Sequence, residues 1–181
     1  MPIGGLEYAF GHAPQRDVDF VSAWHEASDT VKRDVEQYWY QYRLVRVADI
    51  DKRTAELAAV AYCGKELVAV STAEPTEWMN LRLLHYRCSV APSYRRREVT
   101  WRLTNFTFGL LGEWALKHPE DAYAGLLVTL EARQFIGHMG SPIISKHGMD
   151  LVFIGRNANG YQRRAIWFKH ANVESNLFPA S

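Results

Sequence analysis

Cysteine, net charge and long apolar runs are all scarce in this sequence of 181 residues. Its two cysteines, Cys63 and Cys88, show no metal-site spacing and are too few for a disulfide framework, so we expect both to be small buried side chains. A total of 21 Lys and Arg against 20 Asp and Glu leaves a net charge of +1, which gives no general attraction to nucleic acid or acidic lipid. No run approaches the ~20 apolar residues that cross a bilayer, and the chain does not open on a basic segment followed by an apolar one. We therefore expect a reduced, cytoplasmic setting.

What the sequence does contain is the composition of a folded domain. Hydrophobic residues make up 48% of the chain and charged residues 23%, which are ordinary proportions for a globular protein. A chain of this length buries roughly 70% of the surface that it exposes when unfolded, enough for one core. These figures exclude disordered, collagen-like and purely coiled-coil proteins, and they predict a single domain over residues 1–181.

The predicted helices and strands follow one another in a mixed order. Periodicity and turn residues predict strands at 6–10, 56–62, 66–72, 81–90, 124–130, 151–155 and 164–169. They predict helices that begin after Asp17 or Asp19 and near Thr30, a long helix over 95–118, and a broken helical stretch over 133–147 that Gly148 terminates in a left-handed conformation. Antiparallel hairpins combined with a strand–helix–strand unit indicate a mixed α+β or α/β protein.

The long helix predicted over 95–118 carries one apolar stripe. Apolar side chains recur along it at spacings of three and four, at Val99, Leu103, Phe106, Leu110 and Trp114. Gly109 and Gly112 each cost a helix interior up to ~1 kcal/mol relative to alanine. We expect close packing against a neighbouring element to explain these two glycines.

The segment from Val90 to Leu103 is the most informative part of the chain. It predicts the end of a strand, a turn marked by Pro92, a basic loop and the start of the long helix. The first turn of a helix offers unpaired N–H groups and the positive end of the helix dipole. Arg95, Arg96 and Arg97 add charge-assisted donors. The pattern predicts a site for a pyrophosphate or ribose phosphate; the alternative is a solvated or acid-paired arginine surface.

This segment resembles the acyl-CoA motif of the GNAT superfamily of N-acyltransferases, Val-x-Pro-x-x-Arg-x-x-Gly-x-Gly/Ala. Val90, Pro92 and Arg95 match it, and the order of elements is similar over nearly the whole chain. The resemblance implies a central mixed sheet flanked by helices. It also implies transfer of an acyl group from acetyl-CoA or another acyl-CoA to a primary amine of a small molecule or macromolecule.

The resemblance further implies which residues bind the coenzyme. Main-chain groups around Cys88 and Val90 would bind the pantetheine arm, and the amides of Arg95, Arg96, Arg97, Glu98, Val99 and Thr100 would hold the pyrophosphate. Glu98 and Thr100 occupy positions where the family usually has small residues. A carboxylate at Glu98 would repel the phosphates unless it turns away or pairs with Arg95 or Arg102.

The reaction implied by the resemblance also needs a general base. A lysine-like amine has a pKa near 10.4, so only about one molecule in 10³ is neutral at pH 7. In the family the base is often a Glu in the strand before the motif, and the acid is a Tyr before the Lys-x-Gly turn. These positions fall on Leu84 and Ile144, neither of which transfers protons.

Other side chains near those positions are candidates for catalysis. They are Glu74, His85, Tyr86, Glu131 and His138. Strand alternation places Tyr86 on the same face as Leu84, and His85 on the opposite face. Glu74 would act through a water, and Glu131 would lie at an opening beyond the strand predicted at 124–130. A structural, hydrogen-bonded role is the alternative for each. The seven histidines show no ligand-like spacing, so we expect no metal.

Two rival functions stay open from the sequence. A GNAT-fold module that binds acyl-CoA without catalysis would explain the missing Glu and Tyr. A fainter resemblance, in residues 137–140 and Ile143–Ile144, is to the Mom-type phage branch of the superfamily, which modifies DNA bases; scattered arginines would contact the phosphates. The near-neutral total charge gives no dominant basic surface for nucleic acid.

Aromatic residues suggest two further expectations. In the family, the early helices wall the acceptor pocket, so an aromatic cluster there would select an apolar or aromatic amine; core packing is the alternative. That cluster is Trp24, Tyr38, Trp39 and Tyr40. Trp167 and Phe168 alternate across the final predicted strand, so one of them is a candidate contact of a homodimer.

Overall fold

The computed structural model of the chain describes residues 17–95, 98–131 and 140–171. The strand predicted at 6–10 and the expectations for Arg96, Arg97 and His138 lie outside these residues. Eight strands form one sheet in the order β1-β2-β3-β4-β5-β8-β7-β6. Their bounds are β1 (Asp19–Ser22), β2 (Leu57–Cys63), β3 (Glu66–Trp78), β4 (Leu81–Val90), β5 (Tyr123–Leu130), β6 (Ile143–Lys146), β7 (Met149–Arg156) and β8 (Gln162–Trp167). The mixed α+β class predicted from the sequence is confirmed.

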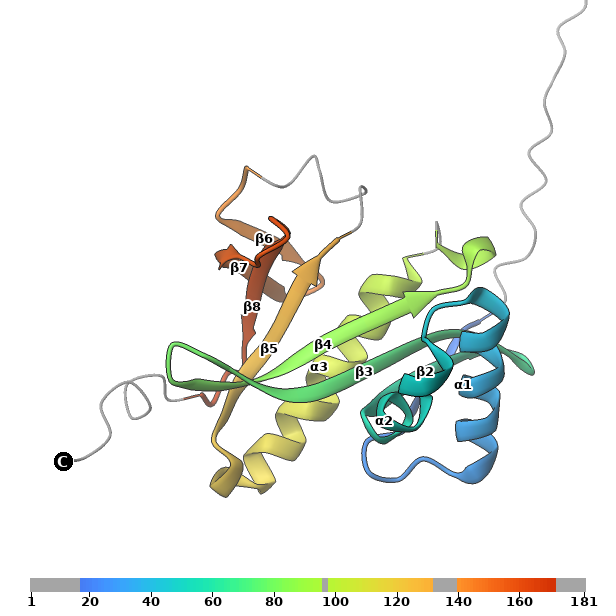
Figure 1. Ribbon diagram of the computed structural model, residues 1–181. Helices are drawn as coiled ribbons and strands as arrows, with labels where there is room; N and C mark the ends of the chain where they lie inside the picture. Colours follow the sequence, from blue (N-terminus) through green and yellow to red (C-terminus); the bar gives the residue numbers. More distant parts are fainter. Residues whose placement is uncertain (1–16, 96–97, 132–139, 172–181) are drawn as a thin grey trace, which may run out of the picture.

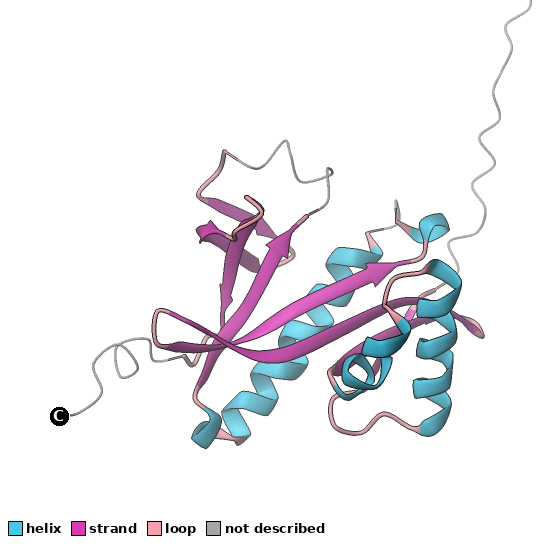
Figure 2. Ribbon diagram, in the orientation of Figure 1, coloured by secondary structure: helices cyan, strands magenta, loops and turns pink. Residues whose placement is uncertain are grey.

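Helices cover both faces of this sheet (Figures 1 and 2). The long helix α3 (Val99–Lys117) lies on one face, and α1 (Asp29–Tyr42) and α2 (Ile50–Ala55) lie on the other. On the α3 side, Leu111 packs with Leu84, Leu126 and Ile166 of the sheet in one buried cluster. On the α1 side, Trp39 belongs to a second cluster formed with β2 and β3. No helix of the described residues is long and apolar enough to cross a membrane.

Several predicted elements match the structure closely. The strand at 81–90 is β4, and the helix predicted from Thr30 is α1, whose first turn is capped by the Ser28 hydroxyl accepting from the Val31 N–H. Close packing explains Gly112, where a Cβ atom would lie 3.3 Å from the Phe168 ring. It does not explain Gly109, where a Cβ atom would meet nothing within 4 Å.

Three predictions were wrong. Residues 19–22 form strand β1 rather than a helix, because they pair antiparallel with Ala59–Tyr62 of β2. Helix α3 begins at Val99 rather than Arg95, since Pro92–Tyr94 forms a separate 3-10 turn. Residues 143–146 form β6 rather than part of a broken helix. Gly148 does adopt the predicted left-handed conformation (φ +77°), but it closes the β6–β7 hairpin.

Candidate active site

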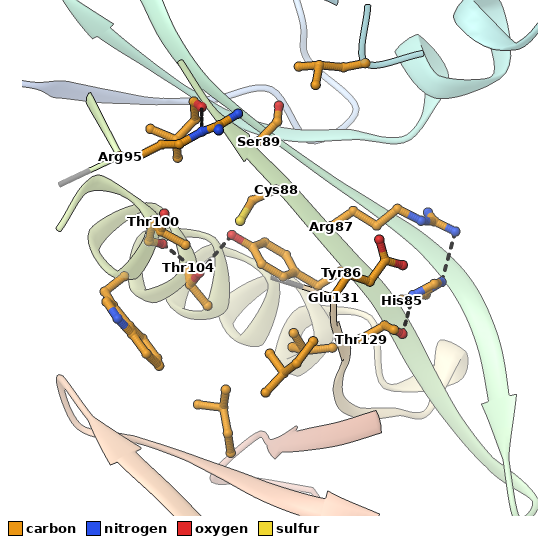
Figure 3. Close-up of a pocket in the computed structure, with 16 residues that line it drawn as sticks. His85, Tyr86, Arg87, Cys88, Ser89, Arg95, Thr100, Thr104, Thr129 and Glu131 are labelled. Carbon is orange, nitrogen blue, oxygen red and sulfur yellow. Dashed lines mark hydrogen bonds between the residues drawn. The ribbon is translucent and has the colours of Figure 1, made fainter. Parts of the chain in front are cut away.

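The neighbouring strands β4 and β5 run parallel and then separate. Their pairing extends from Arg82 opposite Tyr123 to Tyr86 opposite Val128. Beyond Tyr86, β4 continues to Val90 without a β5 partner, and Figure 1 shows the ends of the two strands diverging. A cavity of about 530 Å³ lies at this separation (Figure 3). The split between two strands therefore creates the space for a ligand.

Residues from both faces of the sheet line this cavity. Successive side chains of a strand point to opposite faces, so Tyr86 and Cys88 face α3, whereas His85, Arg87 and Ser89 face the α1–α2 side. All five line the cavity. The remaining lining residues are Leu44, Val90, Arg95, Thr100, Trp101, Thr104, Val128, Thr129, Leu130, Glu131 and Leu151. The cavity thus connects the two faces where the strands part.

Tyr86 is held in place by a hydrogen-bond chain to helix α3. Its hydroxyl lies 3.0 Å from the Thr104 Oγ1, and the Thr104 hydroxyl donates to the Thr100 carbonyl at 2.7 Å. Because the Thr104 hydroxyl has one proton and donates it to Thr100, it can only accept from Tyr86, so Tyr86 is the donor (Figure 3). Burial raises the pKa of Tyr86 well above its ordinary value. Tyr86 therefore keeps its proton and is fixed against α3 on the face of Leu84, as predicted.

His85 is neutral and carries its proton on Nε2. The Arg87 Nη2 lies 2.9 Å from the His85 Nδ1, and a guanidinium only donates, so Nδ1 accepts. The Nε2–H then faces the Thr129 Oγ1 at 3.4 Å. Burial and the positive charge of Arg87 lower the pKa of His85 to about 4. The imidazole is therefore a weak base whose accepting nitrogen is already occupied.

Glu74 lies beside the cavity and not in its wall. It is opposite His85 on β3, and its carboxylate pairs with Arg87 and, at 3.3 Å, with the Lys52 Nζ. Although burial opposes ionisation, the hydrogen bond from Arg87 lowers the pKa of Glu74 to about 2. A second carboxylate, Glu56, accepts from the Arg53 Nη1 at 2.6 Å. Glu74 is thus committed to an ion-pair network that orients Arg87.

Glu131 is the carboxylate that lines the cavity itself. It follows β5 directly, at the opening where the sequence analysis placed it, and its side chain is exposed (Figure 3). It forms no ion pair or hydrogen bond with another residue of the described segments. Glu131 is therefore free to exchange a proton with a ligand.

The residues expected to bind the coenzyme are largely brought together. Cys88, Val90, Arg95 and Thr100 all line the cavity. Cys88 is exposed there, which corrects the expectation of a buried side chain; Cys63 is buried as expected. The Arg95 Nε donates to the Val90 carbonyl at 3.1 Å and so binds the end of β4.

Val99 and Glu98 define the start of helix α3. The Val99 side chain is completely buried, so it offers a ligand its main chain alone. Glu98 has a left-handed conformation (φ +57°), and its own side chain does not cap the helix. The Glu98 carboxylate turns toward the β6–β7 hairpin, 2.8 Å from the Lys146 Nζ and 3.4 Å from the His147 Nε2. Of the two alternatives given in the sequence analysis, the carboxylate therefore turns away and does not pair with Arg95 or Arg102, and Lys146 lowers its pKa.

The early aromatic residues belong to the core or surface and not to this cavity. Trp24, Tyr38 and Trp39 are buried in the packing clusters, and Tyr40 is exposed. None of them lines the cavity. Residues that the sequence analysis missed are Leu44, Arg87, Ser89, Trp101, Thr104 and Thr129. Alternation along β4, once the cavity was known to lie at its end, would have indicated Arg87 and Ser89.

Comparison with known proteins identifies the fold. No protein-family model matches the sequence, and no curated protein matches it. The acetyltransferase of the GNAT family from Streptococcus pneumoniae has a similar structure, with a TM-score of 0.53 at 9% identity over 83% of this chain and 96% of that one. The ribosomal-protein-S18-alanine N-acetyltransferase of Escherichia coli has a TM-score of 0.44 at 12% sequence identity, over 87% of this chain and 97% of that one. An aminoglycoside 6′-N-acetyltransferase complexed with coenzyme A has a TM-score of 0.46 at 16% sequence identity, over 82% of this chain and 94% of that one. This chain has the GNAT fold, as its motif implied.

Proposed function

We propose that this protein is an acyl-CoA-dependent N-acyltransferase that acetylates a primary amine. The observation that supports this proposal best is the cavity between the separated ends of β4 and β5. It extends from the start of α3, at Thr100 and Trp101, to the free carboxylate of Glu131. A thioester and an amine would meet there from opposite faces of the sheet.

The residues around the cavity fit coenzyme A. The edge of β4 from Arg87 to Val90 has no β5 partner, so its main-chain groups are available to the two amides of a pantetheine arm, as in strand addition. The uncapped first turn of α3 presents N–H groups to a diphosphate. The Glu98 carboxylate, which would repel that diphosphate, is directed to Lys146. Arg95 supplies a positive charge on the cavity wall.

One side chain of the cavity would transfer protons, and two others would keep its wall in position. When bound, acyl-CoA supplies an activated carbonyl and a thiol leaving group. As the amine nitrogen forms its bond to that carbonyl carbon and the C–S bond breaks, the nitrogen becomes acidic, and Glu131 accepts its proton. Glu131 then passes this proton to the departing thiolate. His85 and Tyr86 hold the cavity wall in position, since each is already engaged in hydrogen bonds.

Calorimetric titration with acetyl-CoA, followed by a thiol-release assay over several classes of amine, tests this function. We expect Glu131→Gln to bind acetyl-CoA as the unsubstituted protein does but to lose about 10²-fold or more in kcat/KM. Glu113→Gln, at an exposed position on α3, is the matched control and should retain activity. Absence of acetyl-CoA binding would contradict the proposal. Binding of acetyl-CoA without thiol release with any amine would support the rival function, a module that binds acyl-CoA without catalysis.

A further inference from the structure

Arg163 of β8 is a cation that has no ion-pair partner within the part of the chain that the structure describes. Its side chain is half-buried, and its Nε is buried without a hydrogen-bond partner. Among residues 17–95, 98–131 and 140–171, no carboxylate lies within ion-pair distance of its guanidinium. Buried polar groups in folded proteins are nearly always satisfied, so an orphaned guanidinium nitrogen requires an explanation.

The next residue shows how an arginine is satisfied in this sheet. Arg164 is completely buried, yet its guanidinium donates to the Gln162 side chain and to the carbonyls of Ser141 and Leu151. Arg163 has the same chemistry and no such acceptor among residues 17–95, 98–131 and 140–171, so a bound ligand could supply one.

Arg163 also lies beside the candidate active site. It pairs across the strands with Thr129, which lines the cavity and lies 3.4 Å from the His85 Nε2. The positive charge of Arg163 is one of the causes, after burial and Arg87, that lower the pKa of His85. Both arginine and imidazole therefore lie on the α1–α2 side of the sheet, from which the amine would approach.

The surroundings of Arg163 leave room for a ligand. Its partner on β7 is Gly155, which has a φ of +133° at an irregularity in the strand pairing. A Cβ atom at Gly155 would meet nothing within 4 Å, so the space beside it is open. On the other side, Glu131 provides a free carboxylate near the end of β5. Among the described residues, an unpaired cation beside the cavity and an unpaired anion in its wall are thus available to a ligand.

We propose that Arg163 binds a carboxylate carried by the acceptor, so that the substrate class is an amino acid or another amine with a carboxylate close to its nitrogen. This inference rests on the proposed function. The amine would be directed to Glu131, and the carboxylate would satisfy the guanidinium of Arg163 in a charge-assisted hydrogen bond. A single free guanidinium suits a singly charged carboxylate better than a phosphate dianion, which needs more donors.

Matched pairs of amines that differ by one carboxylate test the assignment. Tyrosine against tyramine and lysine against cadaverine are compared in a thiol-release assay with acetyl-CoA. We expect the amino acid to have a kcat/KM at least about tenfold higher than its decarboxylated partner. Arg163→Met should abolish that ratio by lowering the rate with the amino acid alone, and Arg163→Lys should restore part of it. Arg156→Met, an exposed arginine on β7, is the matched control.

A second measurement keeps the inference separate from the proposed function. The unfolding temperature is measured with each amino acid and each decarboxylated amine in the presence of coenzyme A. We expect amino acids to stabilise the unsubstituted protein and not Arg163→Met. Equal effects of both members of every pair, or equal effects on both proteins, would overturn the inference. Stabilisation through Arg163 without thiol release would uphold it while contradicting catalysis.

Discussion

The ammonium of Lys146 lies 2.8 Å from the carboxylate of Glu98, although 48 residues separate the two in the chain. The ion pair connects the β6–β7 hairpin to the start of α3. The hairpin also contacts the body of this helix: Lys146 lies 5.3 Å from the centre of the Trp101 ring, and the Asn105 amide donates to the His147 carbonyl at 2.8 Å. Glu98 is thus accommodated at a position where the GNAT motif has a glycine.

The first prediction concerns this position. We expect Glu98→Gly to bind acetyl-CoA about threefold to tenfold more tightly, because glycine adopts a left-handed conformation at no steric cost and removes a negative charge from the start of the helix. Lys146→Met is the matched variant: it keeps the carboxylate but removes its partner, so we expect weaker binding. Isothermal titration calorimetry measures both. Binding by Glu98→Gly that is no tighter than that of the unsubstituted protein would contradict this account.

The second prediction concerns pH and His85. The folded protein holds the pKa of His85 at about 4, below its ordinary value of 6.5, so the unfolded chain takes up the proton first as the pH falls. The free energy of unfolding is therefore unaffected by His85 above pH 6.5, and it decreases between pH 6.5 and pH 4 by about 3 kcal/mol in total. Urea unfolding across this range should show a shallower pH dependence for His85→Gln. His118→Gln, the control, should follow the unsubstituted protein; identical slopes for all three would refute the prediction.

The third prediction separates two glycines of α3. Gly109→Ala should raise the free energy of unfolding by up to about 1 kcal/mol, because alanine favours the helix and the added methyl group meets open space. Gly112→Ala should gain less or lose stability, since its methyl group would press on the Phe168 ring. Urea unfolding of the two variants provides the comparison. Equal gains at both positions would show that packing does not distinguish them.

The fourth prediction uses the cysteines to locate the coenzyme. Iodoacetamide should modify Cys88, which is exposed in the cavity, and leave the buried Cys63 intact. The reaction should be slow at pH 7, because desolvation raises the pKa of the Cys88 thiol. Bound acetyl-CoA should slow it about fivefold or more, as read by mass spectrometry of the peptides. Unchanged modification of Cys88 under saturating acetyl-CoA would place the coenzyme elsewhere.

The sequence predicted the elements whose signals are local. The apolar run 81–90 is followed by Pro92 and is β4, and the spacing of Val31, Val35 and Tyr38 indicated α1. Strand β1 was missed because its four residues depend on pairing with β2. The stretch 143–146 was read as helical because its local pattern does not reveal the partner strand β7.

The residues of the candidate site were likewise predictable only where their signal is local in the sequence. His85, Tyr86, Cys88 and Val90 follow one another on β4, so one motif located them all, and Glu131 followed from the end of an apolar strand. The partners of Glu98 could not be predicted, because no sequence pattern joins residue 98 to the turn at 146–147. The place of Arg163 beside the cavity could not be predicted for a similar reason: its relation to Thr129 exists only in the register of β5 and β8.

The cavity's two-sided wall has a kinetic consequence. In the proposed reaction, thioester and acceptor would reach the reacting carbon along separate routes, because Thr100 and Trp101 bound the cavity on one face of the sheet and Leu44 and His85 bound it on the other. Neither has to depart before the other arrives, and no covalent intermediate on the polypeptide is required. Reciprocal initial-rate plots, drawn at several fixed concentrations of either substrate, should intersect and not run parallel.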